Sequence, residues 1–239
     1  MKPLIIALLV LCCATAQAQP VLQTDLPLKY LVQTGAKPEG QPLVIFIHGY
    51  GANEEDLFTL KQHLPGDYTY LSVRAPLEMS NGGYKWFTRL PGNGEYDGVA
   101  SDLASSEHQL IAFIRQAQRK YASDAAHTYL VGFSQGAILS YQLAVRDPQL
   151  VAGIAALSGK MLPELRETAK PVPGLAQLKV FIAHGTADSV LPYDAAPQAA
   201  ALLKRLGVAA QFHAYPGMEH TVNMQEADDL AGWLQTVTQ

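Results

Sequence analysis

The chain of 239 residues is long enough for one large domain or two small ones. Hydrophobic residues make up 49% of it and charged residues 16%, which allows a sizeable core and excludes a disordered chain. The formal net charge is −4 and there is no run of Lys or Arg, so the composition argues against nucleic-acid binding and against a polybasic membrane patch.

The N-terminal segment has the pattern of a secretory signal peptide. Lys2 supplies the positive start, residues 3–13 (PLIIALLVLCC) form the apolar stretch, and Ala16 and Ala18 are the small residues that a signal peptidase requires. The apolar stretch is shorter than the about 20 residues of a stable membrane-spanning helix. The sequence therefore predicts a signal peptide over residues 1–18, cleaved after Ala18, and export to the periplasm or the medium. A retained N-terminal anchor is the alternative.

Both cysteines of the chain, Cys12 and Cys13, lie inside this segment. The mature domain, residues 19–239, would thus contain no thiol, which excludes a cysteine nucleophile and a cysteine-bound zinc ion. Without residues 1–18 we expect no stable membrane association. The sequence carries no signal for the oligomeric state.

Strand-like apolar runs alternate with helical patterns along the rest of the chain. The run 44–47 (VIFI) is typical of a strand buried on both faces, and Asn53 is placed to cap a helix that includes Leu57 and Leu64. Further strands are expected over 68–73, 128–133, 151–157, 179–183 and 209–215, and helices over 103–121, 137–145, 195–206 and 226–237, with a long loop over 77–98. This alternation indicates an α/β fold with a largely parallel central sheet and helices on both faces.

The connections place a candidate site at one edge of this sheet. Ligands of parallel α/β sheets bind at the carboxyl ends of the strands, so residues that directly follow strands are the first candidates. Only about twenty residues separate the strand ending at Leu157 from the strand starting at Lys179. That is too few for a large lid domain, and we expect an open site.

Residues 132–136 (GFSQG) match the G-x-S-x-G pattern between a predicted strand and a predicted helix. A sharp turn there lifts the hydroxyl of Ser134 clear of the sheet, and the flanking glycines relieve the crowding. The N-terminus of the helix beneath the turn favours developing negative charge. This context predicts Ser134 as a nucleophile, which needs a base because a free serine hydroxyl reacts poorly.

A carboxylate and a histidine follow in the chain order that this type of site requires, Ser, then Asp or Glu, then His. Asp188 lies in the loop after the strand 179–183, and His220 lies in the loop after the last strand. His184 and His48 also follow strands, but their chain order does not complete a triad. The sequence therefore predicts Ser134, Asp188 and His220 as the catalytic residues.

An oxyanion hole is expected from the turn after the strand 44–47. Residues 48–51 (HGYG) are similar to the HG-type turn of esterases. The expected donors are the backbone N–H groups of Tyr50 and of Gln135, the residue after the nucleophile.

These segments together resemble the bacterial phospholipase/carboxylesterase family, which includes acyl-protein thioesterases. The resemblance covers the chain from about Leu43 to the C-terminus and implies the α/β-hydrolase fold, the triad Ser134, Asp188 and His220, and an oxyanion hole at Tyr50 and Gln135. Its motifs are HGYG, Trp86-Phe87, GFSQG, LSGKMLP from Leu157, HGTADSVLP from His184 and YPGMEH from Tyr215.

Four apolar residues in loops at the same edge are candidates for the substrate pocket, namely Trp86, Phe87, Met161 and Leu162. The alternative is that they fill the core beneath those loops.

The function expected from the sequence is a serine carboxylesterase that hydrolyses short- to medium-chain soluble esters through an acyl-enzyme. Its partner would be a small-molecule ester, and the chemistry requires no metal and no organic cofactor. A thioesterase or an esterase for acylated or feruloylated sugars would use the same residues. A non-catalytic binding module on this fold is the alternative from a different class.

Overall fold

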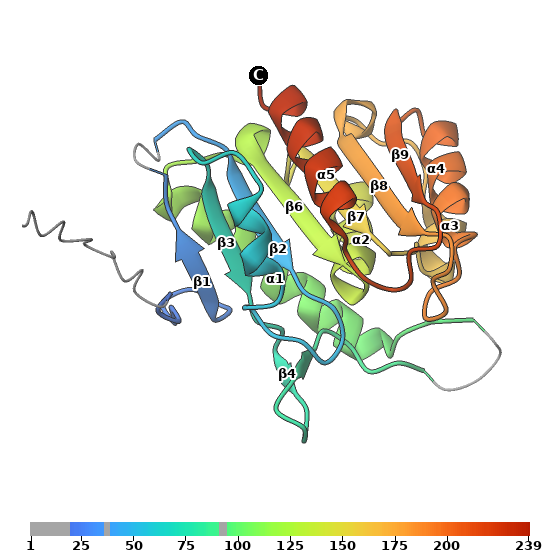
Figure 1. Cartoon of the computed structure of the whole chain (residues 1–239), viewed down its shortest axis with the longest axis horizontal. Coiled ribbons are helices and arrows are strands. Elements are labelled where there is room, and N and C mark those ends of the chain that lie inside the picture. Colours follow the sequence, from blue (N-terminus) through green and yellow to red (C-terminus); the bar gives the residue numbers. More distant parts are fainter. Residues whose placement is uncertain (1–19, 36–38, 91–94) are drawn as a thin grey trace, which may run out of the picture.

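The computed structural model describes residues 20–35, 39–90 and 95–239, so the expected signal peptide lies outside the described residues (Figure 1). Its centre is a seven-stranded sheet with the order β1-β3-β2-β6-β7-β8-β9. β1 pairs antiparallel with β3, and all other neighbours pair in parallel. The strands are β1 Tyr30–Gln33, β2 Leu43–Ile47, β3 Thr69–Val73, β6 Thr128–Phe133, β7 Gly153–Leu157, β8 Lys179–Gly185 and β9 Ala210–Tyr215.

Helices cover both faces of the sheet, as the apolar strands require. β2 and β7 are buried along their whole length, and their alternate side chains enter two separate apolar clusters. One cluster packs against α1 (Ala100–Lys120), α2 (Gln135–Arg146), α3 (Pro163–Thr168) and α4 (Ala195–Arg205), and the other against α5 (Met224–Val237) and the 3-10 helix η1 (Leu57–Gln62). Figure 1 shows α5 on the face opposite α1 and α2. The predicted α/β fold with a largely parallel sheet is confirmed.

Two local expectations differ from the structure. The helix predicted from Asn53 is the 3-10 helix η1, which begins only at Leu57 and has no side-chain cap. Asn53 accepts a hydrogen bond from the N–H of Glu55 at 2.8 Å, so its side chain closes a local turn in competition with the helix. The edge strand β1 was not expected, and the loop 77–98 contains a small hairpin of β4 (Leu77–Glu78) and β5 (Tyr84–Lys85).

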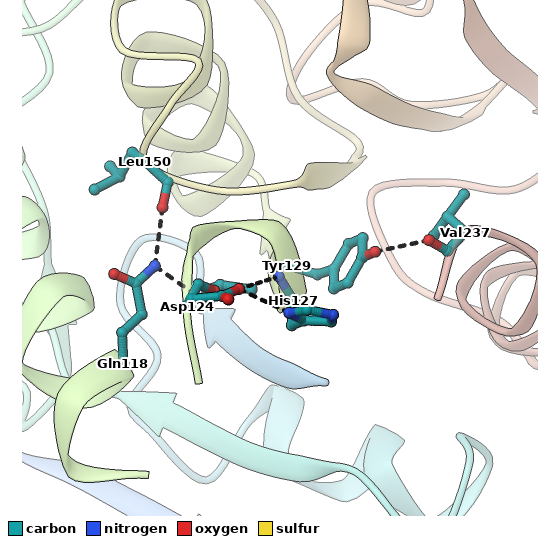
Figure 2. A network of polar contacts seen from close by, with 7 residues as sticks. Gln118, Asp124, His127, Tyr129, Leu150 and Val237 are labelled. Atoms are coloured by element: carbon teal, nitrogen blue, oxygen red, sulfur yellow. Dashed lines mark hydrogen bonds and ion pairs between the residues drawn. The ribbon is translucent and has the colours of Figure 1, made fainter. Parts of the chain in front are cut away.

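Polar contacts fix the amino end of β6, the strand that precedes Ser134. The amide of Gln118 in α1 donates to Thr128 Oγ1 at 3.1 Å and to the carbonyl of Leu150 at 2.9 Å. On the other face the hydroxyl of Tyr129 donates to the carbonyl of Val237 at 2.7 Å (Figure 2). β6 is thereby tied at one end to helices on both faces, which leaves its other end as a rigid support for the turn that follows.

The residues predicted for the site all follow strands at the carboxyl edge of the sheet. Tyr50 comes after β2, Ser134 after β6, Asp188 after β8 and His220 after β9. Between β7 and β8 the chain forms only α3 and the 3-10 helix η3 (Leu175–Gln177), so no large lid covers this edge. A second short 3-10 helix, η2 (Ala125–His127), leads into β6 at the opposite edge. None of the helices in the described ranges has both the length and the apolar character to cross a membrane.

Glu226 near the start of α5 is a buried carboxyl group. Its side chain has no accessible surface, and neither carboxyl oxygen has a hydrogen-bond partner among the described residues. Burial raises the pKa of Glu226 to about 8, and the nearby Asp229 adds to this rise. The carboxyl group is therefore protonated in the folded protein at neutral pH, because an unpaired buried carboxylate is costly.

The Glu226→Gln variant should be more stable than the wild type at alkaline pH. The pKa of Glu226 rises on folding from its ordinary value of 4.5 to about 8, so the group stabilises the fold fully below about pH 4.5 and loses this contribution as the pH rises through about 8. Gln copies the neutral form at every pH. We expect a gain in the free energy of unfolding of roughly 2–4 kcal/mol at about pH 8 and little change at about pH 5.

Denaturant unfolding at both pH values measures this difference, and Glu167→Gln, a change at an exposed carboxylate, is the matched control. An equal effect of Glu226→Gln at both pH values would contradict the buried, protonated carboxyl group.

Candidate active site

Ser134 lies in a strained turn between β6 and α2. Its φ of 53° and ψ of −114° are unusual for a residue with a side chain, a strain that is concentrated at functional sites. A Cβ on Gly132 would lie 2.4 Å from the carbonyl of Gly136, and a Cβ on Gly136 would lie 1.8 Å from the carbonyl oxygen of Ile47. Only glycine therefore allows α2 to start this close to β2 and β6, and the turn holds the hydroxyl above the sheet.

The structure brings Ser134, His220 and Asp188 into one hydrogen-bonded chain. His220 Nε2 is 2.9 Å from Ser134 Oγ, and His220 Nδ1 is 2.7 Å from Asp188 Oδ2. Because the carboxylate can only accept, the proton of the neutral imidazole lies on Nδ1 and Nε2 is free to accept the proton of Ser134. The ring of Phe133 packs against the imidazole with centroids 4.8 Å apart. This is the geometry of a nucleophile, a base and an orienting acid.

Four donors surround the buried carboxylate of Asp188. Its Oδ1 accepts from the backbone N–H groups of Val190 and Leu191, each at 2.9 Å. Its Oδ2 accepts from His220 and also lies 3.1 Å from His184 Nε2. A buried charge requires such partners, and the two backbone donors fix the carboxylate plane that orients His220.

His184 is a second buried histidine beside the carboxylate. Its Nε2 lies 2.9 Å from the carbonyl oxygen of Leu191 and 3.1 Å from Asp188 Oδ2. Both neighbours are acceptors, so the proton of His184 must lie on Nε2 and is shared between them. Burial lowers the pKa of His184, which keeps the ring neutral. Only the four-residue spacing between His184 and Asp188 in the sequence points to this contact.

The turn after β2 packs directly against the nucleophile. A Cβ on Gly49 would lie 3.2 Å from the Cβ of Ser134. The backbone N–H groups of Tyr50 and Gln135, the expected oxyanion donors, have no acceptor among residues 20–35, 39–90 and 95–239. Two unpaired donors next to a serine hydroxyl suit an oxygen that gains negative charge. Tyr50 itself is 52% exposed.

A buried histidine holds this turn in shape. His48 Nδ1 donates to the carbonyl of Gly49 at 2.7 Å, and Nε2 accepts from the N–H of Ala75 at 3.1 Å. This pattern requires a neutral ring, and burial lowers the pKa of His48 to about 4. The indole N–H of Trp86 donates to the carbonyl of His48 at 2.9 Å. The turn is thus fixed by contacts from β3 and from the long loop 77–98.

The side chain of Gln135 ties the long loop to the nucleophilic turn. Its Oε1 accepts from the N–H of Trp86 at 3.0 Å, and its Nε2 donates to the carbonyl of Phe87 at 2.9 Å and to the hydroxyl of Tyr96 at 3.2 Å. The sequence indicated only the backbone N–H of this residue. No local pattern reveals a contact between side chains and loops that are so far apart along the chain.

All four residues proposed for the substrate pocket lie in the core. Trp86 and Phe87 have 0% of their surface exposed, Leu162 has 1% and Met161 has 2%, so they correspond to the alternative in which they fill the space beneath the loops. Trp86 is buried because its indole N–H donates to the carbonyl of His48, which places the ring beneath the turn after β2. Met161 alone lines a cavity of about 320 Å³ at this edge of the sheet.

Metal binding has no support in the part of the chain that the structure describes, because no group of three or more His, Cys, Asp or Glu side chains could hold an ion there.

Comparisons with known proteins identify the family of the chain. A family model described as Phospholipase/Carboxylesterase matches residues 29–238. Acyl-protein thioesterase 1 of Debaryomyces hansenii is 28% identical over 86% of this chain and 95% of its own, and carboxylesterase SOBER1 of Arabidopsis thaliana is 25% identical over 80% and 89%. The crystal structure of the Bacillus cereus carboxylesterase superposes with a TM-score of 0.76 at 25% identity and covers 88% of this chain and 94% of its own.

The fold and the matched relatives define a serine hydrolase of the α/β-hydrolase fold. Within that class the chain belongs to the phospholipase/carboxylesterase family, whose members act on small-molecule esters and include thioesterases. The predicted family and fold class are both confirmed.

The contact between His184 and Asp188 leads to a prediction about pH dependence. His184→Leu removes a donor to the carboxylate, so kcat should fall by about tenfold or more while KM changes little. The carboxylate would then attract the proton of the neighbouring imidazolium more strongly, and the acidic midpoint of the kcat/KM profile should move to higher pH. His184→Gln keeps an N–H group near the position of Nε2 and should restore part of the rate and of the midpoint.

Steady-state kinetics on a soluble aryl ester between about pH 5 and pH 9 measures both quantities. Equal losses in the Leu and Gln variants with an unmoved midpoint would show that His184 only fills space.

Proposed function

We propose that this chain is a carboxylesterase that hydrolyses short- to medium-chain soluble esters through an acyl-enzyme on Ser134. The single observation that carries the proposal is the continuous hydrogen-bonded chain from Ser134 Oγ through His220 to Asp188, with distances of 2.9 and 2.7 Å. The membership of the family supports the hydrolysis of esters or thioesters.

Acylation begins when His220 Nε2 takes the proton of Ser134 as Oγ attacks the carbonyl carbon of the ester. The negative charge on the carbonyl oxygen is stabilised by the backbone N–H groups of Tyr50 and Gln135, and each such donor typically contributes about 3 kcal/mol in the transition state. Asp188 stabilises the imidazolium and keeps the useful tautomer. The bond to the alcohol oxygen then breaks, and His220 returns the proton to the leaving alcohol.

Deacylation repeats these steps with water. His220 accepts a proton from the water molecule that attacks the acyl-enzyme, and the tetrahedral intermediate uses the same two N–H groups. Ser134 Oγ leaves and regains the proton from His220. The products are the carboxylic acid and the free enzyme.

A preference for short to medium acyl chains is supported by the few apolar side chains at the open edge. Each buried methylene contributes about 0.8 kcal/mol, close to fourfold in kcat/KM. Trp86, Phe87 and Leu162 are buried in the core, which leaves little exposed apolar surface for a long acyl chain.

A thioesterase is the second candidate, because the relative from Debaryomyces hansenii is named acyl-protein thioesterase 1. The same residues would attack a thioester. Matched esters of choline and thiocholine with equal acyl groups separate the two activities, and a higher kcat/KM for the thioester series at every chain length would favour the second candidate.

Ser134→Ala should leave a folded protein whose kcat for aryl esters is reduced by roughly 10⁴- to 10⁶-fold, since the nucleophile is lost and only the binding contacts and oxyanion donors remain. Ser101→Ala, a change at an exposed serine in α1, is the matched control and should retain full activity. A loss below tenfold in Ser134→Ala would place the nucleophile elsewhere.

The chain-length preference is tested with p-nitrophenyl esters from acetate to palmitate, each kept below its solubility limit. We expect kcat/KM to rise over the first few carbons and then to level or fall, because the gain per methylene ends where the apolar surface ends. A continuous rise to palmitate would contradict the proposed preference.

We also propose that residues 1–18 direct export and are removed after Ala18, on the basis of the charge, the apolar stretch and the small residues described above. Mass spectrometry of the protein from the periplasm or medium should find Gln19, free or cyclised, at the N-terminus. A peptide with intact Cys12 and Cys13 would contradict this proposal.

A further inference from the structure

A cavity of about 320 Å³ opens at the carboxyl edge of the sheet, lined by residues that follow β7 and β8 and by Glu95 and Tyr96. The hydroxyl of Tyr96 in its wall accepts from the side chain of Gln135, the residue after Ser134. Lys160 and Met161 enter it from the segment after β7, whose last residue, Leu157, accepts the N–H of Ser134 at 3.0 Å. The cavity is therefore close enough to the proposed catalytic serine to hold one end of a substrate.

Two cations in the cavity wall share a single carboxylate. Lys160 Nζ lies 3.1 Å and Arg166 Nη2 lies 2.5 Å from the same oxygen of Glu95. The side chain of Lys160 is only 9% exposed, while that of Glu95 is 43% exposed. An ammonium has three donors and a guanidinium has five, and besides Glu95 their one partner among the described residues is Gln198 Oε1, 3.4 Å from Arg166 Nη1, so several donors are unused. The inner wall thus carries more positive charge than Glu95 neutralises.

The other acidic residue of the cavity does not remove this excess. Asp194 lies at the start of α4, where its exposed side chain makes no capping hydrogen bond. Solvent and salt screen an exposed charge of this kind much more than the nearly buried ammonium of Lys160. The uncharged part of the wall is mixed, with the apolar Met161 and Ala199 beside the polar Tyr96 and Gln198.

We propose that this cavity binds a carboxylate group carried by the ester substrate, with Lys160 and Arg166 as its partners, so that the enzyme prefers esters that bear a negative charge some carbons away from the scissile bond. The carboxylate site rests on the proposed esterase function and specifies the substrate class of that esterase. The carboxylate of Glu95 already occupies the two cations and shows that a carboxylate can meet both at once. A planar carboxylate also suits the fork of an arginine.

The competing explanation is that the three side chains only anchor the long loop to α3. The two explanations predict effects of opposite sign for one substitution, measured as the preference for the charged over the neutral ester. If the cluster is an anchor, the loss of either Lys160 or Glu95 weakens it and affects charged and neutral esters alike. If it is a carboxylate site, Lys160→Met removes a partner of the substrate, whereas Glu95→Gln removes a competitor for it.

The test uses two pairs of esters that differ only in charge. Mono-4-nitrophenyl adipate and 4-nitrophenyl 5-carbamoylpentanoate place the charge on the acyl side, and 4-carboxyphenyl and 4-carbamoylphenyl hexanoate place it on the alcohol side. The measured quantity is the ratio of kcat/KM for the charged ester over the neutral ester, corrected for spontaneous hydrolysis. The variants are Lys160→Met, which keeps an apolar stem of similar length, Glu95→Gln, and Lys170→Met as an exposed control.

In the wild type we expect the ratio to exceed one for one of the two pairs. Lys160→Met should lower that ratio by about tenfold to hundredfold, the usual effect of a lost charge-assisted hydrogen bond. Glu95→Gln should raise it, and Lys170→Met should leave it unchanged. Thermal unfolding of each variant checks that it is folded.

Two results would overturn the carboxylate site. One is a ratio at or below one for both pairs in the wild type. The other is an equal fall in kcat/KM for the charged and the neutral ester in both Lys160→Met and Glu95→Gln. Hydrolysis of the neutral esters by the wild type would still support the proposed esterase. If neither neutral ester were hydrolysed in a Ser134-dependent manner, the proposed function itself would fail.

Discussion

The close approach of α2 to β2 and β6 is the constraint on which the rest of the site depends. Gly136 leaves no room for a side chain against the carbonyl of Ile47, and this contact forces the turn in which Ser134 takes a positive φ of 53°. α2 begins directly after Ser134, and a Cβ on Gly49 in the turn after β2 would lie 3.2 Å from the Cβ of Ser134. The strained residue is held by its own backbone, because its N–H donates to the carbonyl of Leu157 at 3.0 Å and its carbonyl accepts from the N–H of Ile138 at 3.0 Å.

Two neutral histidines hold the parts of the site around this turn in place. His48 fixes the turn after β2 and His184 donates to the carboxylate of Asp188, and burial lowers the pKa of both rings. A protonated His48 could not accept from the N–H of Ala75, so the shape of the proposed oxyanion site depends on its neutrality. The buried carboxylate of Asp188 meets four donors, two backbone N–H groups and two histidine rings, and through Oδ2 it orients His220.

Much of this arrangement could be predicted from the sequence. Continuous apolar runs such as 44–47 and 128–133 mark strands buried on both faces, and chain order selected Ser134, Asp188 and His220 as the residues that the structure brings together. The α/β fold follows from the alternation of these runs with helical patterns. The edge strand β1 was missed because it is short and pairs with a strand distant along the chain.

Contacts between distant loops could not be predicted. Trp86 and Phe87 are apolar residues in a loop near the site, and only the hydrogen bonds from Trp86 to His48 and from Gln135 to the loop show that they fill the core. In the same way, Lys160 and Glu95 are ordinary surface residue types until the fold places them together in one cavity. A sequence pattern indicates which edge carries the site, while the shape of the pocket depends on side-chain contacts of this kind.

The central claim is that Ser134 forms the covalent acyl-enzyme, and active-site labelling tests it most directly. The protein is treated with a fluorophosphonate, digested, and the modified peptide is identified by mass spectrometry. We expect one adduct on Ser134 and its loss after denaturation or in the His220→Ala variant, because the hydroxyl reacts only when the base accepts its proton. An adduct on another residue, or rapid labelling that survives the loss of His220, would contradict the account.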